Sequence, residues 1–326
     1  MSLSVAVVQG GPSSEAEVSR ASATAIAKAL AASGHRVVRL ELDAFLADSL
    51  RTGGFEVVFP ACHGAVGEDG SLQGLLEVMD LPYVGSAVLA SALAMNKRAA
   101  KTFFRNIGLP VAASHHARRG GDAARDAEQA LRELGDALVV KPCSSGSAVG
   151  VTRFESGATA ADVARAIESV LAVDEVALIE RFAPGREVTC GVLDTSARRA
   201  LPPTEIRSPK DAFYTYEARY APGRSEHLCP APLDASATKR VQEVAVAAHA
   251  VLGCRDLSRV DFVVGEGANA VTLLEVNTMP GFTETSLYPE AAAIAGIPMP
   301  ALCNDLVEHA HRRGPPRRNA ALPLPK

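Results

Sequence analysis

Two carboxylates and one amide lie near the end of the chain, in two neighbouring segments with the apolar pattern of strands. Glu275 and Asn277 are two residues apart, and Asp261 lies between two apolar residues in the segment before them. Because strand side chains alternate between the faces of a sheet, we expect all three to face the same side. Hard oxygen ligands of this kind suit Mg2+, which shares its coordination shell with phosphates. A solvated sheet face with scattered acids is the alternative, and the run Thr278-Met279-Pro280-Gly281 that follows favours the metal site.

A lysine and a loop of small residues form a second candidate site. Lys141 closes a predicted strand and is followed by Pro142-Cys143-Ser144-Ser145-Gly146-Ser147-Ala148-Val149-Gly150. Such a loop can hold phosphate through the lysine charge and backbone N–H groups. The lysine precedes the glycines, so this is not a Walker loop, and an ordinary hairpin loop is the alternative. Lys97 opens a predicted helix and offers a second phosphate contact, although an exposed helix lysine would leave the same pattern.

The third candidate is the loop from Gly10 to Ser19, at the carboxyl end of the first predicted strand, where α/β sheets bind ligands. Ser14 and Glu17 have the spacing of a capping box, so we expect Glu17 only to begin the helix. Glu15 could hold an ammonium group, or could act only on the helix dipole.

The elements that position these loops begin with an alternation of strands and helices. The apolar pattern predicts strands at 4–9, 37–40, 55–60 and 82–84, and helices at 14–32 and 72–79. The first of these helices is expected to end near Gly34. This rhythm predicts an α/β fold that begins with a doubly wound parallel sheet, whose ligands bind at the carboxyl ends of its strands. We place this first domain at residues 1–86.

Two further domains follow. The second, at 87–182, has predicted helices at 88–95, 97–107 and 160–171 and strands at 139–142, 151–154 and 177–180. The third, at 183–312, is of α+β type, with predicted strands at 187–193, 258–264 and 271–276 and a helix at 235–252 between Asp234 as N-cap and Gly253 as terminator. The long polar segment 208–229 is typical of a functional lid. Residues 313–326 are basic and rich in proline, which predicts a disordered tail.

Composition narrows the classes of partner. The 326 residues carry a formal net charge of -4, and the pI is about 6.1, so nothing favours nucleic acid or an anionic membrane. No apolar stretch is long enough to cross a bilayer, and the first residues lack the basic region of a signal peptide. Six scattered cysteines without a Cys-x-x-Cys pair indicate reduced thiols of a cytoplasmic protein, and argue against a zinc site or a disulfide framework.

Taken together, these segments resemble the D-alanine–D-alanine ligase family of the ATP-grasp superfamily, from about Val5 to Glu308. The matching pieces come in the family's order, and they are the Gly10 loop, Cys62-His63-Gly64, Gly67-Glu68-Asp69-Gly70-Ser71-Leu72-Gln73-Gly74, Pro82-Tyr83-Val84-Gly85-Ser86, Met95-Asn96-Lys97, the Lys141 loop, Leu178-Ile179-Glu180-Arg181-Phe182, Phe213-Tyr214-Thr215-Tyr216-Glu217-Ala218-Arg219-Tyr220 and Glu275-Val276-Asn277-Thr278-Met279-Pro280-Gly281-Phe282-Thr283. The resemblance implies an ATP-grasp fold and the ATP-dependent joining of two D-alanine molecules through an acyl phosphate, for peptidoglycan precursor synthesis. It also implies a homodimer.

The resemblance assigns ligands to residues. It implies that Lys97 and Lys141 bind the α- and β-phosphates of ATP. The adenine and ribose would meet a run along the chain, namely Glu180, Arg181, Phe182, Ala183 and Glu187. Two Mg2+ ions, or Mn2+ in their place, would be held by Asp261, Glu275 and Asn277, and would offset the charge that builds during phosphoryl transfer.

The amino-acid substrates are assigned in the same way. Glu15 would bind the first ammonium group with His63 beside it, although His63 alone is typical of a structural histidine at a turn. Arg259 and the backbone N–H of Gly281 would form an oxyanion hole. Ser286 and Leu287 would bind the carboxylate of the second substrate. A hydrogen-bonded set that ties the lid to the site would comprise Glu15, Ser147 and Tyr220, and Arg219 would be one of the substrate-binding residues.

Four positions depart from the family pattern, and they are Arg219 for a common lysine, Cys143-Ser144-Ser145 for a more polar run, Ala148 for a second serine and Thr285 for a frequent histidine. These departures bear on rate and on the second substrate, which could instead be D-serine, D-lactate or another amino acid. Tyr220 favours an amino acid over a hydroxy acid. A different ATP-grasp ligase, such as a carboxylase, and a non-catalytic nucleotide-binding protein are the remaining alternatives, and the latter predicts a lost lysine or metal ligand where none is lost.

Overall fold

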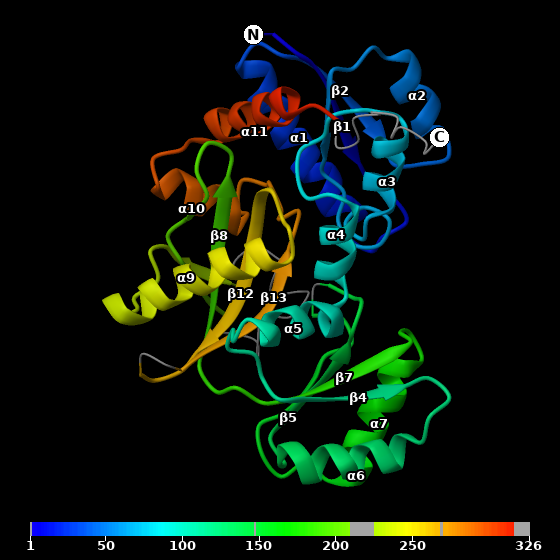
Figure 1. Ribbon diagram of the computed structural model, residues 1–326, viewed down its shortest axis with the longest axis vertical. Coiled ribbons are helices and arrows are strands. Elements are labelled where there is room, and N and C mark those ends of the chain that lie inside the picture. The colour runs from blue at the N-terminus through cyan, green and yellow to red at the C-terminus, as the bar shows by residue number, and fades with distance from the viewer. Residues whose placement is uncertain (1, 147, 209–224, 268–269, 316–326) are drawn as a thin grey trace, which may run out of the picture.

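The computed structural model describes residues 2–146, 148–208, 225–267 and 270–315. Three sheets follow one another along the long axis, with the N-terminal sheet at one end, a four-stranded sheet at the other and a six-stranded sheet between them (Figure 1). No helix in these described ranges is both long and apolar enough to cross a membrane.

The N-terminal sheet has the parallel order β2-β1-β3. Its strands are β1 (Ser4–Gln9), β2 (Arg36–Glu41) and β3 (Val57–Pro60), and its helices are α1 (Ala16–Ala32), α2 (Leu46–Thr52) and α3 (Ser71–Val78). Val5 and Val7 pack in one core with α1, whereas Ala6 and Val8 pack in another with α2 and α3. Both faces of the sheet are therefore covered, and the predicted doubly wound arrangement is confirmed. The strand predicted at 82–84 is reduced to one bridge between Tyr83 and Val58.

The beginning of α1 differs from the prediction. Glu15 is the N-cap residue, and no side chain caps the helix. The capping box predicted for Ser14 and Glu17 is therefore wrong, because the exposed Glu17 carboxylate pairs with Arg20 one turn later. The helix ends as predicted, since Gly34 adopts a φ of +88°, a backbone conformation that an L side chain rarely adopts.

The four-stranded sheet is antiparallel, in the order β4-β7-β5-β6. Its strands are β4 (Ser114–Arg118), β5 (Leu138–Pro142), β6 (Thr152–Phe154) and β7 (Val176–Arg181), and α6 (Ala123–Leu134) and α7 (Ala160–Leu171) pack on it. Two helices lead into this sheet, α4 (Val88–Met95) and α5 (Lys97–Asn106), and Asn96 caps the second by accepting a hydrogen bond from the Ala99 N–H. The sequence did not predict β4, whose charged and histidine-rich residues hide the alternation of a half-buried strand.

The six-stranded sheet has the order β11-β10-β8-β12-β13, with β9 paired to β8. Its strands are β8 (Arg186–Asp194), β9 (Arg199–Ala200), β10 (Thr204–Arg207), β11 (Glu226–Leu228), β12 (Asp256–Val264) and β13 (Val271–Asn277). Helix α9 (Ala235–Val251) packs on it, with Asp234 as the predicted N-cap accepting from the Ala237 N–H. The polar segment predicted as a lid loop at 208–229 ends in β11, so it is not a loop throughout, and residues 209–224 lie outside the described part.

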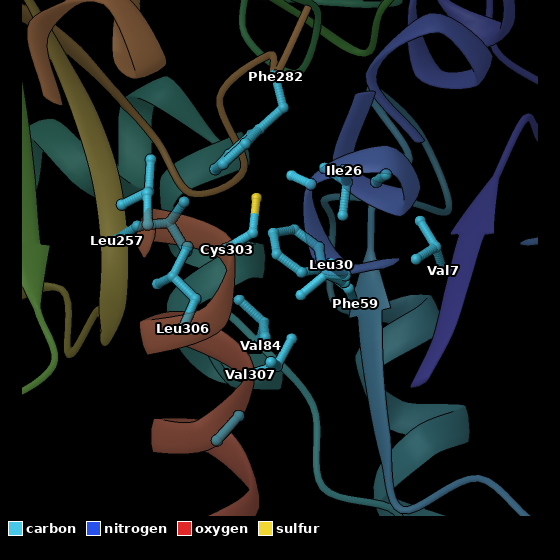
Figure 2. Packing of buried hydrophobic residues seen from close by; sticks show 14 of the residues in the cluster. Val7, Ile26, Leu30, Phe59, Val84, Leu257, Phe282, Cys303, Leu306 and Val307 are labelled. Carbon is cyan, nitrogen blue, oxygen red and sulfur yellow. The ribbon is translucent and has the colours of Figure 1, made fainter. Parts of the chain in front are cut away.

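The last helices return to the N-terminal sheet. They are α10 (Leu287–Ile294) and α11 (Met299–Arg313), and α11 lies beside α1 (Figure 1). The tail predicted from residue 313 is corrected at its first position, because Arg313 is helical and ion-paired. Figure 2 shows Phe59 and Ile26 of the N-terminal unit facing Phe282 and Leu306, and the rings of Phe59 and Phe282 meet edge to face with centroids 5.5 Å apart. One apolar core thus joins the first and last parts of the chain.

A buried carboxylate reinforces this junction. Asp256 is fully buried at the start of β12, and its Oδ2 accepts a 2.7 Å hydrogen bond from the Gly85 N–H. Arg313 pairs with the same carboxylate and donates to the Tyr83 carbonyl at 2.8 Å. A strand of the third sheet, the last helix and the N-terminal unit are therefore held at one point.

Candidate active site

Two cavities adjoin where the three sheets meet. The first lies between the four-stranded sheet and β12 and β13, and the second lies between the N-terminal unit, β12, β13 and the beginning of α10. Gly146 and Glu275 line both cavities. The Lys141 loop, which contains Gly146, and one predicted metal ligand thus lie at the boundary between the two cavities.

The first cavity receives two lysines. Lys97 and Lys141 are both buried and line it, and Lys97 Nζ donates to the Ser145 carbonyl at 2.6 Å. Lys97 Nζ also lies 2.9 Å from Glu275 Oε2, so the first lysine reaches across to the other wall of the cavity. The structure therefore brings together the two lysines, the small-residue loop and β13, as a phosphate site requires.

Glu180 forms the centre of a buried ionic bridge in this cavity. Lys141 Nζ lies 2.6 Å from Glu180 Oε2, and Lys101 Nζ lies 2.7 Å from Glu180 Oε1. Burial alone would raise the pKa of Glu180, but the two lysine charges outweigh it and hold the pKa at about 2. The sequence analysis missed Lys101. Its position one helical turn after Lys97, on the buried side of α5 with Ala100 and Phe104, was the available signal.

The outer end of the first cavity carries an arginine that the sequence analysis also missed. Arg153 lies over the Phe182 ring, 5.1 Å from its centroid, and its Nη1 lies 3.6 Å from Glu187 Oε1. Ala183 and Arg181 line the same wall, although the Arg181 Nε donates to the Leu134 carbonyl at 3.1 Å. The predicted adenine and ribose residues therefore line the same cavity.

The predicted metal ligands lie on one face of the β12–β13 pair. In the strand register Asp261 is opposite Glu275, and Arg259 is opposite Asn277, so the prediction of a common face is confirmed. Arg259 donates to both oxygens of Asp261, at 2.9 and 2.8 Å, and Thr189 Oγ1 donates to Oδ1 at 2.7 Å. Within the described residues no three His, Cys, Asp or Glu side chains gather at metal-binding distances, which leaves the mixed carboxylate and amide set as the candidate.

The second cavity brings Glu15 and His63 together. A Cβ placed on Gly64 would lie 3.2 Å from Glu15 Oε2, and one placed on Gly146 would lie 3.6 Å from it, so the carboxylate sits between two glycine backbones. His63 is buried, and its Nε2 lies 3.4 Å from Ser22 Oγ. Burial lowers the pKa of His63, which favours the neutral ring although the Glu15 charge opposes this.

Glu68 also lines the second cavity, and the sequence analysis gave it no role. Its Oε2 accepts a 2.5 Å hydrogen bond from the Gly64 N–H, next to His63. Burial and the nearby Glu15 charge raise the pKa of Glu68 to about 8. The neighbouring Asp69 instead fixes the turn, by accepting from the Val66 and Ser71 N–H groups. A glutamate in a glycine-rich turn gives no sign of burial, which explains the omission.

Gly281, Ser286 and Leu287 form the far side of the second cavity. A Cβ on Gly281 would come within 2.8 Å of Ser286 Oγ, so the two are in close contact. Ser286 Oγ accepts from the Thr283 N–H at 2.9 Å. Leu287 begins α10, whose N-terminal partial charge suits a carboxylate. Thr285 lines the same wall.

Three predicted residues lie outside the described part of the chain, whereas three of the four departures from the family pattern lie within it. Ser147, Arg219 and Tyr220 lie outside the described residues. Cys143 is buried, and its Sγ donates to Asn96 Oδ1 at 3.3 Å and accepts from the Arg98 N–H at 3.4 Å, so this departure fastens the phosphate loop to α5. Ala148 has a φ of +56°, an uncommon conformation for alanine.

Comparison with known proteins agrees with this arrangement. The family model of the D-ala D-ala ligase C-terminus matches residues 103–308, and that of the D-ala D-ala ligase N-terminus matches residues 46–86. The D-alanine–D-alanine ligase of Desulforamulus reducens is 41% identical over 315 residues, covering 95% of this chain and 99% of the relative. The ligase of Acidiphilium cryptum is 44% identical over 309 residues, covering 94% and 98%.

Solved structures give the same result. The chain superposes on the D-alanine–D-alanine ligase from Bacillus anthracis complexed with ATP, with a TM-score of 0.81, 29% identity and coverage of 96% of this chain and 98% of that one. For the ligase from Coxiella burnetii the TM-score is 0.80, the identity 30% and the coverage 96% of each chain. The expected ATP-grasp fold is thereby confirmed, and the chain belongs to the D-alanine–D-alanine ligase family.

Proposed function

We propose that this chain joins two D-alanine molecules to D-alanyl-D-alanine, with conversion of ATP to ADP and phosphate. The observation that carries the proposal is the pair of adjoining cavities that share Gly146 and Glu275. One cavity carries cations suited to phosphates, and the other carries groups suited to a zwitterionic amino acid. A γ-phosphate in the first would lie next to a carboxylate in the second.

The reaction follows in two steps. A carboxylate oxygen of the first D-alanine attacks the γ-phosphorus, the bond from the γ-phosphorus to the β-γ bridging oxygen breaks, and ADP leaves an acyl phosphate. The amine of the second D-alanine then attacks the acyl carbon, loses a proton and expels inorganic phosphate. Phosphorylation in the first step turns a carboxylate oxygen of D-alanine into part of a leaving group. The carboxylate of free D-alanine has no such leaving group.

Binding of ATP is assigned to the first cavity. Lys97 and Lys141 would meet the phosphates through their charge. Glu180 and the backbone to Ala183 would meet the adenine, and Glu187, held near Arg153, would meet the ribose hydroxyls. The fact that all these residues line the first cavity supports this assignment.

Magnesium fits the β12–β13 face. Asp261 and Glu275 offer carboxylates and Asn277 an amide oxygen, and all three are donors that Mg2+ prefers. In the structure Arg259 pairs with Asp261 and Lys97 pairs with Glu275, so both carboxylates already bind a cation. Two Mg2+ ions, or Mn2+, would neutralise charge on the transferred phosphoryl group when bound.

The second cavity is assigned to the amino acids. Glu15 would accept hydrogen bonds from the first ammonium group, with His63 and its neutral ring beside it. Arg259, whose guanidinium plane is fixed by Asp261, would form the oxyanion hole with the Gly281 N–H. Ser286 and Leu287 would bind the second carboxylate at the beginning of α10.

The division into domains at 1–86, 87–182 and 183–312 is supported by the three separate sheets. A lid that includes Tyr220 and ties to Glu15 and Ser147 would exclude water from the acyl phosphate. The resemblance also supports a cytoplasmic homodimer, which light scattering coupled to gel filtration would test.

The test is ADP release by the purified protein with ATP, Mg2+ and D-alanine alone, followed by mass identification of the product. We expect D-alanyl-D-alanine. D-Serine, D-lactate and L-alanine are then added in turn. A mixed product formed in preference would assign a different second substrate, and no ADP with any pair from folded, ATP-binding protein would refute the ligase proposal.

A further inference from the structure

Lys101 is a buried cation that the proposed function does not use. It is only 1% exposed, and it lines neither cavity. A lysine removed from water is stable only when its charge is compensated at close range. Its Nζ has two partners that the structure identifies, Glu180 Oε1 at 2.7 Å and the Leu273 carbonyl at 3.5 Å. The carboxylate supplies the charge compensation, and the β13 carbonyl is a second, longer contact of the ammonium group.

Glu180 connects this buried cation to the first cavity, which is the one assigned to ATP. Each of its oxygens lies near a different lysine, Oε1 near Lys101 and Oε2 near Lys141 at 2.6 Å. Two ammonium groups and one carboxylate leave one positive charge on the bridge. Without Lys101, the carboxylate would compensate Lys141 alone, and the bridge would carry no net charge towards a phosphate.

The β13 residue that Lys101 contacts lies beside residues of the first cavity. Leu273, whose carbonyl accepts from Lys101, donates its N–H to the Pro110 carbonyl at 2.7 Å. Its neighbours in the chain, Thr272 and Leu274, line the first cavity. The ammonium group is therefore held against β13, and Glu180 is held against the ammonium group.

We propose that Lys101 is a positioning residue for nucleotide phosphates, which takes one oxygen of Glu180 and so leaves Lys141 with positive charge for a phosphate group. The inference rests on the proposed assignment of the first cavity to ATP. Glu180 raises the pKa of Lys141 above its ordinary value against the effect of burial, whereas burial lowers the pKa of Lys101 even though the Glu180 charge opposes this.

The test compares ligands with and without phosphates. Kd values for ADP with Mg2+ and for adenosine are measured by calorimetry on the wild type, Lys101→Met and the control Lys239→Met, whose lysine is exposed on α9. We expect Lys101→Met to weaken ADP binding at least about tenfold, the size of one lost charge-assisted contact, with adenosine within about twofold. Equal losses for both ligands would indicate a merely structural role and overturn the proposal, as would unchanged ADP binding.

A second pair of variants covers the case in which Lys101→Met does not fold. Lys101→Met combined with Glu180→Gln leaves neither charge of the pair buried alone. If Lys101 acts through Glu180, the double variant binds ADP as Glu180→Gln does, and a further tenfold loss overturns the proposal. A wild type that forms no D-alanyl-D-alanine but shows these ADP effects would refute the proposed ligation and leave the role of Lys101 intact.

Discussion

Lys97 and Glu275 form an ion pair, 2.9 Å from Nζ to Oε2, across the boundary between the two cavities. The pair joins a residue proposed for phosphate binding to one proposed for metal binding. When a nucleotide and Mg2+ bind, each member would exchange its partner for a ligand of the same charge sign. The ionic balance of the site is then preserved.

Glu275→Gln should abolish ADP formation and leave the fold intact. The amide keeps the size of the side chain, but it removes the charge that would hold the metal. ADP release and thermal unfolding are measured together, with Glu266→Gln at an exposed position as the control. Turnover close to that of the wild type would rule out Glu275 as a metal ligand.

Lys97→Met should raise the KM for ATP at least about tenfold, because a charge-assisted phosphate contact contributes about 1.5–3 kcal/mol. The KM for D-alanine should change less, since Lys97 lines only the first cavity. Steady-state kinetics with each substrate varied in turn check this, against Lys239→Met. Equal changes in both KM values would contradict the phosphate assignment.

Gly281→Ala should lower the yield of dipeptide. The new Cβ would meet Ser286 Oγ at 2.8 Å and would displace one wall of the second subsite. Gly74→Ala is the matched control, because its Cβ would find only Val88 Cγ2 at 3.9 Å, an ordinary contact. Dipeptide is quantified by mass spectrometry, and wild-type yield from Gly281→Ala would show that this wall does not limit the reaction.

Glu68 predicts a pH dependence of stability. Its pKa is about 8 in the folded protein against 4.5 for the ordinary group, so between these values the folded state binds more protons than the unfolded chain. The free energy of unfolding contributed by Glu68 is therefore fully present below the lower value and falls as pH rises, by up to about 1.4 kcal/mol per pH unit. Glu68→Gln should remove this decline. Urea unfolding across the range measures it, and profiles parallel to the wild type would exclude a buried, protonated Glu68.

The sequence predicted the common face of Asp261, Glu275 and Asn277 because the relevant information is local. Strand alternation places Glu275 and Asn277 together, and the glycine turn before β13 brings Asp261 opposite Glu275. The helix ends at Asp234 and Gly34 were predicted for the same reason, since caps depend on neighbouring residues. The prediction of a capping box at the beginning of α1 was wrong because Glu17 pairs with Arg20 and not with the backbone.

The buried ionic residues could not be predicted in this way. Lys101 and Glu180 belong to separate elements, and nothing near either residue indicates that the fold brings them together. The same applies to Glu68, whose altered pKa depends on burial beneath distant segments. Burial of a charged group is a property of tertiary packing, which periodicity within one segment does not record.

Asp256 determines how the two ends of the chain come apart. Release of the last turn of α11 would remove Arg313 from a fully buried carboxylate, and breaking a buried ion pair costs about 3–5 kcal/mol. Fraying of the C-terminal helix is therefore not a local event. Its loss also releases the Tyr83 carbonyl from Arg313, beside the Gly85 N–H that Asp256 holds. The N-terminal unit and the final helix should unfold as one cooperative block, with β12 as their common anchor.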